Sequence, residues 1–145
     1  MRILVVNGPN LDRLGVREPE IYGTQTLGDI ERRVRGRAAA RGAEVDFFQS
    51  PSEGRIIEYL HREGPAADGI IINPAGLTHY SIALYDCLNT LAAPVVEVHI
   101  SNLHARTDGS FRSRSVTAPA AVGVITGLGA AGYLLALEYL IDRDQ

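Results

Sequence analysis

The sequence predicts an α/β fold, in which a five-stranded parallel sheet is covered by helices on both faces. Short, β-branched apolar runs alternate along the chain with segments of helix length and helical periodicity, which is the pattern of repeated βαβ units. The chain has 145 residues, 46% of them apolar, and this is enough for one hydrophobic core. No linker, repeat or low-complexity tract interrupts the pattern, so we expect one domain spanning residues 1–145.

Each predicted strand is a short apolar run that ends at polar or turn-forming residues. The five strands are expected at Arg2 to Val6, Val45 to Gln49, Gly69 to Asn73, Val95 to His99 and Val122 to Thr126. Four helices are expected: one after Thr26, which has the character of an N-cap, one after Ser52, one from about His79 to Leu91, and one from about Ala130 to Arg143. By analogy, this number of elements suggests a flavodoxin-like strand order.

Composition and charge exclude several classes of protein. The net charge of −3 gives no basic field for nucleic acid. No secretory signal follows Arg2, and glycines interrupt the apolar stretch from Val122 to Ile141, so we expect a cytoplasmic protein that does not enter a membrane. All 14 basic residues are arginine, which excludes a lysine Schiff base with a carbonyl substrate. The single cysteine, Cys87, is expected to be a small core residue.

The connection between the first strand and the first helix is the most informative segment. It runs from Gly8 to Gln25, whereas such connections in compact domains are usually about 2–6 residues long. Ligands bind outside the carboxyl ends of parallel strands, and this segment leaves such an end. It places Asn10, Arg17 and Tyr22 among glycines and prolines that bend the chain. We therefore predict a lid that carries reactive side chains.

Polar side chains also follow the third and fourth predicted strands. The turn from Asn73 to His79 leads into a helix whose free N–H groups suit an anion such as a carboxylate. Glu97 and His99 lie two apart on a strand and point to the same face, where the carboxylate would orient the imidazole and favour its protonated form. The pair suits a general acid, although the alternative is a purely structural hydrogen bond. The polar loop that follows carries three arginines expected in the same crevice: Arg106, Arg112 and Arg114.

The other motifs support neither a metal site nor a nucleotide site. His99 and His104 lie five apart without cysteine or acidic ligands in a metal-site pattern, so no metal is predicted. The run from Gly127 to Gly132 matches the dinucleotide fingerprint, but too few residues follow for the second strand and the acidic residue that the fingerprint requires. These glycines are expected to let the last helix approach the sheet or a neighbouring subunit closely. His61 is expected on the surface, and His104 either in the loop or at the pocket rim.

Six motifs together resemble the type II 3-dehydroquinate dehydratases, or type II dehydroquinases. They occur in family order over about residues 2–140: Asn7-Gly-Pro-Asn-Leu, Arg17-Glu-Pro-x-x-Tyr22-Gly, Gln49-Ser50-x-x-Glu53-Gly54, Asn73-Pro-Ala-Gly-x-Thr-His79, Glu97-Val-His99-Ile-Ser-Asn and Gly127-x-Gly-x-x-Gly-Tyr133. The resemblance implies a flavodoxin-like enzyme without metal or organic cofactor, assembled as a homododecamer of trimers. The absence of lysine agrees with this family and excludes the type I enzymes, which form a lysine imine.

The resemblance also implies a reaction. It is the anti elimination of water from 3-dehydroquinate through an enolate, giving 3-dehydroshikimate, in the shikimate pathway (aromatic amino acid biosynthesis) or in quinate catabolism. Tyr22 would be the base, and the nearby cation of Arg17 would favour its phenolate form. Asn10 would stabilise the enolate. His99, oriented by Glu97, would protonate the departing hydroxyl. The implied substrate-binding residues are Asn73, Ile100 and Ser101 for the carboxylate, His79 and Arg112 for the ring hydroxyls, and Asp86 for the pocket of an adjacent subunit.

The loop after Arg106 departs most from the family pattern. The segment Thr107-Asp-Gly-Ser110 replaces a short acidic pair and is two residues longer, which raises the alternative that the substrate is an amino analogue of dehydroquinate. A non-catalytic, flavodoxin-like binding domain is another alternative. The chain lacks the Ser/Thr-rich phosphate loop of a flavin module and the lysine of a receiver domain. The third alternative is a structural oligomer that has lost its catalytic activity.

Overall fold

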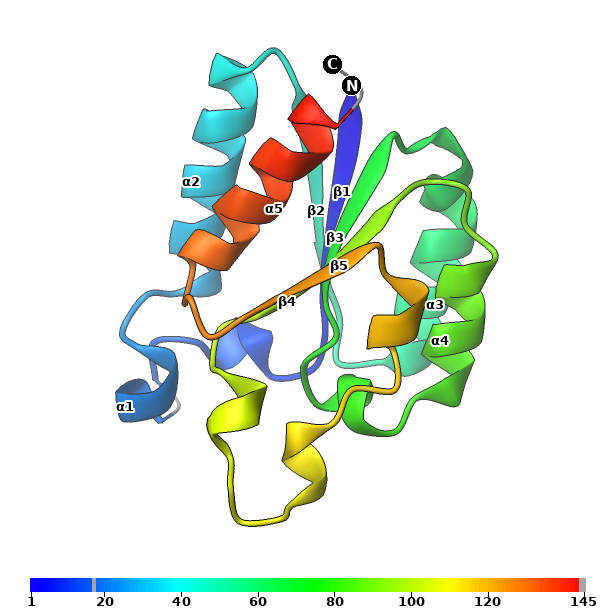
Figure 1. Ribbon diagram of the computed structural model, residues 1–145. Coiled ribbons are helices and arrows are strands. Elements are labelled where there is room, and N and C mark those ends of the chain that lie inside the picture. Colours follow the sequence, from blue (N-terminus) through cyan, green and yellow to red (C-terminus); the bar gives the residue numbers. More distant parts are fainter. Residues whose placement is uncertain (17, 144–145) are drawn as a thin grey trace.

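The structure, a computed structural model, describes residues 1–16 and 18–143, and for Tyr22 the backbone only. Five parallel strands form one sheet in the order β2-β1-β3-β4-β5 (Figure 1). The strands are β1 (Arg2–Asn7), β2 (Glu44–Gln49), β3 (Gly69–Asn73), β4 (Val95–His99) and β5 (Gly123–Thr126). This confirms the predicted α/β fold, and the strand order is that of flavodoxin-like domains.

Helices cover both faces of the sheet, as predicted (Figure 1). One face carries α2 (Leu27–Ala40) and α5 (Ala131–Asp142), and the other carries α3 (Glu53–Glu63) and α4 (Ile82–Asn89). The helix expected from His79 begins later, because residues Ala75–His79 form a separate 3₁₀ helix, η3, and Ser81 is the N-cap of α4. None of the helices in the described part of the chain is long and apolar enough to cross a membrane.

The core explains why the strands read as continuous apolar runs. Successive side chains of a strand point to opposite faces, so Ile71 packs against α2 and α5 while Ile70 and Ile72 pack against α3 and α4. Both faces of β3 are therefore buried, as expected for a central parallel strand. Cys87 is buried in the α3–α4 layer, which confirms its prediction as a core residue, and burial raises the pKa of its thiol.

Local signals in the sequence set the helix ends. The Thr26 side chain accepts a hydrogen bond from the backbone N–H of Asp29, and the Asp29 carboxylate accepts one from the backbone N–H of Thr26. This completes a capping box in which the role of Asp29 was not foreseen. Ser52 accepts a hydrogen bond from the backbone N–H of Arg55 and caps α3 without the second half of a box. Four further 3₁₀ helices bear on the site: η1 (Leu11–Arg13), η4 (Leu103–Ala105), η5 (Phe111–Ser113) and η6 (Ala118–Ala120). Of these, η4 and η5 have side-chain caps, from Asn102 and Ser110.

The carboxyl ends of the central strands lie side by side. Asn7 at the end of β1 is in register with Gln49 on β2 and with Asn73 on β3. The backbone N–H of Gly8 then donates a 2.8 Å hydrogen bond to the carbonyl of Asn73. The loops that leave β1 and β3 are thus joined at their first residues.

The prediction for the glycine-rich motif is also borne out at Gly132, where an added Cβ would lie 3.3 Å from the Cγ2 of Ile125 on β5.

Gly8→Ala is expected to destabilise the fold by about 1–3 kcal/mol, because an added Cβ would lie 2.4 Å from the carbonyl oxygen of Pro74, and backbone must move to relieve the clash. Gly76→Ala is the matched control, since no atom lies within 4 Å of its added Cβ, and we expect a change within about 0.5 kcal/mol. Urea denaturation of both variants measures the difference. Equal midpoints would contradict the close approach of the two loops.

Candidate active site

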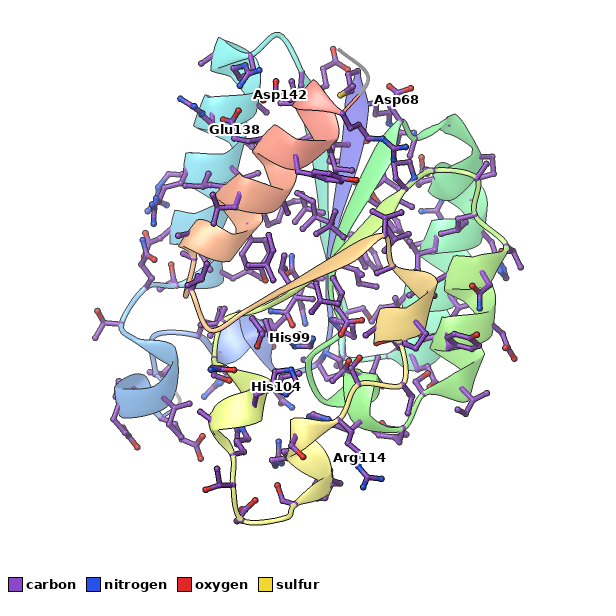
Figure 2. The ribbon with its side chains drawn as sticks, in the orientation of Figure 1. Asp68, His99, His104, Arg114, Glu138 and Asp142 are labelled. Carbon is purple, nitrogen blue, oxygen red and sulfur yellow. The ribbon has the colours of Figure 1, made fainter. Side chains whose placement is uncertain are left out.

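The candidate active site lies at the carboxyl ends of the strands. The lid with α1 (Pro19–Tyr22) and the segment that follows β4, which runs through η4 and η5, both extend beyond this end of the sheet (Figure 1). His99 lies at the same end, whereas Asp68, Glu138 and Asp142 lie at the opposite end (Figure 2). A cavity of about 130 Å³ is found here. Six of the predicted site residues line it: Asn10, His79, His99, Ile100, Ser101 and Arg112.

Glu97 and His99 form a buried pair on β4. The Nε2 atom of His99 lies 2.6 Å from Oε1 of Glu97. Glu97 is 0% exposed and His99 is 5% exposed, while the ring of His99 contributes to the cavity wall. Because Nε2 is taken by the carboxylate, Nδ1 is the ring nitrogen left for a ligand. The geometry is that of an imidazole oriented by a carboxylate, as the spacing in the sequence predicts.

Glu97 is ionised despite its burial. Burial acts to raise the pKa of this carboxyl, but hydrogen bonds from His99, Thr117 and Ser115 outweigh it, so the pKa lies below its usual value. A third hydroxyl, that of Thr78, donates to Oε1 at 2.8 Å. An ionised carboxylate favours the positive charge on a neighbouring imidazole. The pair can therefore present a proton to the cavity.

His79 complements this pair as a neutral imidazole. Burial lowers the pKa of His79, and the nearby charges of Arg112 and Arg106 lower it further, although a hydrogen bond to the backbone of Arg114 acts to raise it. Its Nδ1 lies 2.6 Å from the carbonyl oxygen of Arg114, which can only accept, so Nδ1 carries the proton. The other nitrogen, Nε2, is then an acceptor that suits a hydroxyl group.

Two arginines give the cavity a positive potential. Arg106 and Arg112 both line it, and among the residues that the structure describes neither forms an ion pair with a carboxylate. Arg106 instead donates a long, 3.4 Å hydrogen bond to Oγ of Ser101. Guanidinium groups in a cavity that lack a contacting carboxylate favour an anionic ligand such as a carboxylate. Arg106 was expected on the polar loop, but no individual role was predicted for it.

Not every predicted residue lies on the cavity. Arg114 was expected with the other two arginines, but it is not among the lining residues and lies at the outer side of its loop (Figure 2). Asn73 lies behind the cavity wall: its Nδ2 donates to the hydroxyl of Tyr133 at 3.0 Å, and its Oδ1 accepts from the backbone N–H of Ala75. Asp86 is exposed on α4 and does not line this cavity. His61 is on the surface as expected, and His104, left open by the sequence, is exposed in η4.

The lid borders a second cavity next to the first. Residues Ile21 and Gly23, on either side of Tyr22, line a space of about 420 Å³ together with Ile100, which also lines the first cavity. Arg17 and the side chain of Tyr22 lie outside the described residues, so their predicted roles rest on the sequence. Asn10, at the start of the lid, adopts a left-handed backbone conformation with φ of 69°, which asparagine accepts more readily than most residues.

The residues that the structure describes include no cluster of three or more histidine, cysteine or acidic side chains that could hold a metal ion. The glycine motif at residues 127–132 follows β5 at the edge of the sheet. In the described part of the chain no later strand offers the acidic residue that the dinucleotide fingerprint requires.

Comparison with known proteins connects this site to a family. The family described as dehydroquinase class II matches residues 1–141 of the chain. The 3-dehydroquinate dehydratase of Halothermothrix orenii is 57% identical over 141 residues, with 97% of this chain and 94% of that protein covered. The enzyme of the same name from Bacillus subtilis is 49% identical, with the same shares of the two chains covered.

Solved structures agree with these sequence comparisons. A crystal structure of type II dehydroquinase from Propionibacterium acnes has a TM-score of 0.92 to this structure at 46% identity, and 97% of this chain and 95% of that chain are covered. The corresponding enzyme from Butyrivibrio crossotus has the same TM-score at 41% identity, with 97% of both chains covered. The match extends over the sheet, the cavity and the lid, so the chain belongs to the type II dehydroquinase family.

Proposed function

We propose that this protein is a 3-dehydroquinate dehydratase, a carbon–oxygen lyase that removes water from 3-dehydroquinate by anti elimination to give 3-dehydroshikimate. The observation that carries the proposal is the Glu97–His99 pair on a cavity that two arginines line, in a chain more than half identical to a relative of that name. Domain 1–145 would act as one dehydroquinase-like unit, and the reaction would use side chains alone, without a cofactor.

The first step removes a proton from the carbon next to the substrate ketone. Tyr22 is the proposed base and acts as a tyrosinate. A free tyrosine has a pKa of about 10, so it requires a neighbouring cation, and Arg17, five residues earlier on the same lid, is the proposed source. The electron pair of the broken C–H bond moves to the ketone oxygen and gives an enolate.

The enolate needs a hydrogen-bond donor where its charge develops. Asn10 is the proposed residue, acting directly or through a water molecule, since it lines the cavity at the start of the lid. In the second step the enolate collapses, the carbon–oxygen bond to the leaving hydroxyl breaks, and His99 supplies the proton that turns this hydroxyl into water. Glu97 keeps the imidazole in place and cationic for that transfer.

Substrate binding would use the polar groups around the acid. The backbone near Ile100 and Ser101 is the proposed carboxylate site, and Arg106 adds a positive charge at the same cavity. Asn73, which the family resemblance also assigns to the carboxylate, has both side-chain polar atoms bonded within the protein, so we propose that it supports this site from behind the cavity wall. His79, whose free Nε2 is an acceptor, and Arg112 would bind ring hydroxyls.

Assembly would complete the site. Asp86 is exposed on α4, away from the cavity of its own chain, and we propose that it reaches the cavity of an adjacent subunit in a homododecamer of trimers. Exposed apolar side chains at the edge of the sheet support self-association, because Val122 is 55% exposed and Val124 is 44% exposed beside Tyr139 on α5. We propose a cytoplasmic enzyme that serves aromatic biosynthesis or quinate breakdown.

A direct assay tests the reaction. Pure protein mixed with 3-dehydroquinate should produce the absorbance of the conjugated enone in 3-dehydroshikimate. A flat trace from correctly assembled protein would reject the proposal and leave a non-catalytic role.

The second candidate substrate is an amino analogue of dehydroquinate. It is favoured by the longer loop at Thr107–Ser110, which immediately precedes η5 and therefore Arg112 on the cavity. The ratio of kcat/KM for the two substrates decides between them.

A further inference from the structure

Three hydroxyl groups surround the carboxylate of Glu97, and each comes from a segment outside its strand. Thr78 Oγ1 lies 2.8 Å and Ser115 Oγ lies 2.7 Å from Oε1, while Thr117 Oγ1 lies 2.7 Å from Oε2. Thr78 belongs to η3, after β3, whereas Ser115 and Thr117 lie between η5 and η6. Together with His99, four donors therefore meet one buried carboxylate.

The hydroxyls also contact one another. Thr78 Oγ1 lies 2.6 Å from Ser115 Oγ and 2.8 Å from Thr117 Oγ1, and the last two oxygens are 3.2 Å apart. Each hydroxyl has one proton, so three protons must serve six oxygen–oxygen contacts. The carboxylate is the strongest acceptor in the group, and it is satisfied only when all three protons point to it. The arrangement therefore fits an ionised Glu97 and disfavours a protonated one, which would bring a further proton to Oε1 or Oε2.

We propose that Thr78, Ser115 and Thr117 are positioning residues for the acid step. By donating to Glu97 they reduce the basicity of its carboxylate, so the proton between the two groups stays on Nε2 of His99. The ring then keeps the positive charge that makes its other N–H, at Nδ1, acidic toward the substrate. This inference rests on the proposed role of His99 as the acid.

The same bonds join the acid to the substrate-binding loop. The backbone N–H of Val116 donates to the carbonyl of Thr78 at 2.7 Å, and the carbonyl of Arg114 accepts from His79. Ser115 and Thr117 thus fix the end of the loop that carries Arg112. Loss of one hydroxyl should affect His99 more than the loop, because the loop keeps its two other contacts, Val116 with Thr78 and Arg114 with His79.

The charged and titratable groups near the pair are few in the described part of the chain. His79 comes from η3, and Arg106 and Arg112 come from the segment after β4; all three line the cavity with His99. The neighbouring strands add no charged group at this level of the sheet. Ile72 on β3 and Val124 on β5 are in register with Glu97, and Thr126 on β5 is in register with His99. Removal of a hydroxyl leaves all of these charged and titratable groups in place. A change in the proton position of the Glu97–His99 pair can therefore be attributed to the missing hydroxyl.

The experiment removes one hydroxyl at a time. Thr117→Val keeps the shape of the side chain and Ser115→Ala removes one oxygen atom, while Thr117→Ser and Ser115→Thr retain the hydroxyl. Thr90→Val is the control, because the hydroxyl of Thr90 donates to the carbonyl of Cys87 at the end of α4 and does not contact Glu97. Assembled protein is used throughout, with kcat and KM measured from low to high pH. The ¹⁵N shifts of the His99 ring are recorded by NMR and assigned by their loss in His99→Asn.

We expect kcat to fall about tenfold in Thr117→Val and Ser115→Ala, as for loss of a hydrogen bond to a charged group, with KM nearly unchanged. A carboxylate with one donor fewer is more basic. The Glu97–His99 pair should therefore lose its proton only at higher pH, and the proton should reside on Glu97 more often than in the unmodified protein. The basic limb of kcat should therefore move to higher pH, and the ¹⁵N shifts should show less imidazolium on the plateau. The hydroxyl-retaining variants should restore both.

Two other outcomes would overturn the inference. If the hydroxyls only pack the loop, Thr117→Val and Ser115→Ala will change KM or the urea midpoint and leave the pH profile and the His99 shifts as in the unmodified protein. If Thr90→Val changes the shifts equally, the effect is not specific to Glu97. Failure of the unmodified protein to turn over dehydroquinate would reject the proposed function instead, and the NMR comparison would still test the proton position.

Discussion

Tyr22→Phe is expected to abolish turnover of 3-dehydroquinate, a loss of at least about 10²–10⁴-fold in kcat, because it removes the one oxygen proposed to take the substrate proton. The aromatic ring and the short helix α1 (Pro19–Tyr22) are retained, so the fold and the assembly should be unaffected. Enone absorbance measures the rate, and size-exclusion chromatography with circular dichroism measures the assembly and the fold.

Tyr139→Phe is the matched control for this variant. Tyr139 is about half exposed on α5, away from the cavity, and loss of its hydroxyl should leave kcat unchanged.

Arg17→Gln should lower kcat in the same direction as Tyr22→Phe, since the phenolate would lose its cation, and higher pH should recover part of the activity. Normal turnover in Tyr22→Phe would remove this residue from its role and leave the lid without a base.

Glu97→Gln is the second variant with a large expected effect, a loss of about 10²–10⁴-fold in kcat. The amide has nearly the shape of the carboxylate, and the hydroxyl of Thr117 can turn to accept from the new N–H group, so the fold should persist. The imidazole of His99, however, loses the neighbouring negative charge, which is the feature that favours a protonated imidazole. Steady-state kinetics measures the loss, and unaltered kcat would show that the pair is structural only.

The same variant should change the response of the fold to acid. Hydrogen bonds hold the pKa of Glu97 below its usual value of 4.5 against the opposing effect of burial. The stability that ionised Glu97 contributes is therefore fully present above about pH 4.5 and is lost as the pH falls through the lower pKa of the folded state. Glu97→Gln should unfold with a weaker pH dependence below pH 4.5, measured by urea denaturation. Glu58→Gln, at an exposed position on α3, should keep the steeper dependence.

The fold could be predicted from the sequence because its signals are local. The run from Ile3 to Val6 is apolar at every position, as a strand covered on both faces requires, and it forms β1. The start of α4 was missed because Thr78 and His79 continue the turn after Asn73 as a 3₁₀ helix, and the helix starts at the cap formed by Ser81. Periodicity alone does not separate a 3₁₀ turn from the first turn of an α-helix.

The site was predictable to the extent that strand ends determine it. Residues immediately after β1, β3 and β4 must meet at one edge of a parallel sheet, and Asn10, His79 and His99 do so. The environment of Glu97 could not be predicted in the same way. Its hydroxyl partners are 18 to 20 residues away, on a 3₁₀ helix and an irregular segment, and no periodic pattern in the sequence fixes where such segments pack. The inward orientation of Asn73 likewise depends on Tyr133, which is 60 residues distant in the chain.

The position of the loop at Thr107–Ser110 has an evolutionary consequence. Residues Thr107–Ser110 lie outside the sheet and between its cavity residues Arg106 and Arg112, and they make no contribution to the buried core. Insertions and replacements in this stretch can accumulate without the thermodynamic penalty that a change in β3 or β4 would incur. Selection can therefore retune ligand preference through this loop while the catalytic scaffold is inherited intact.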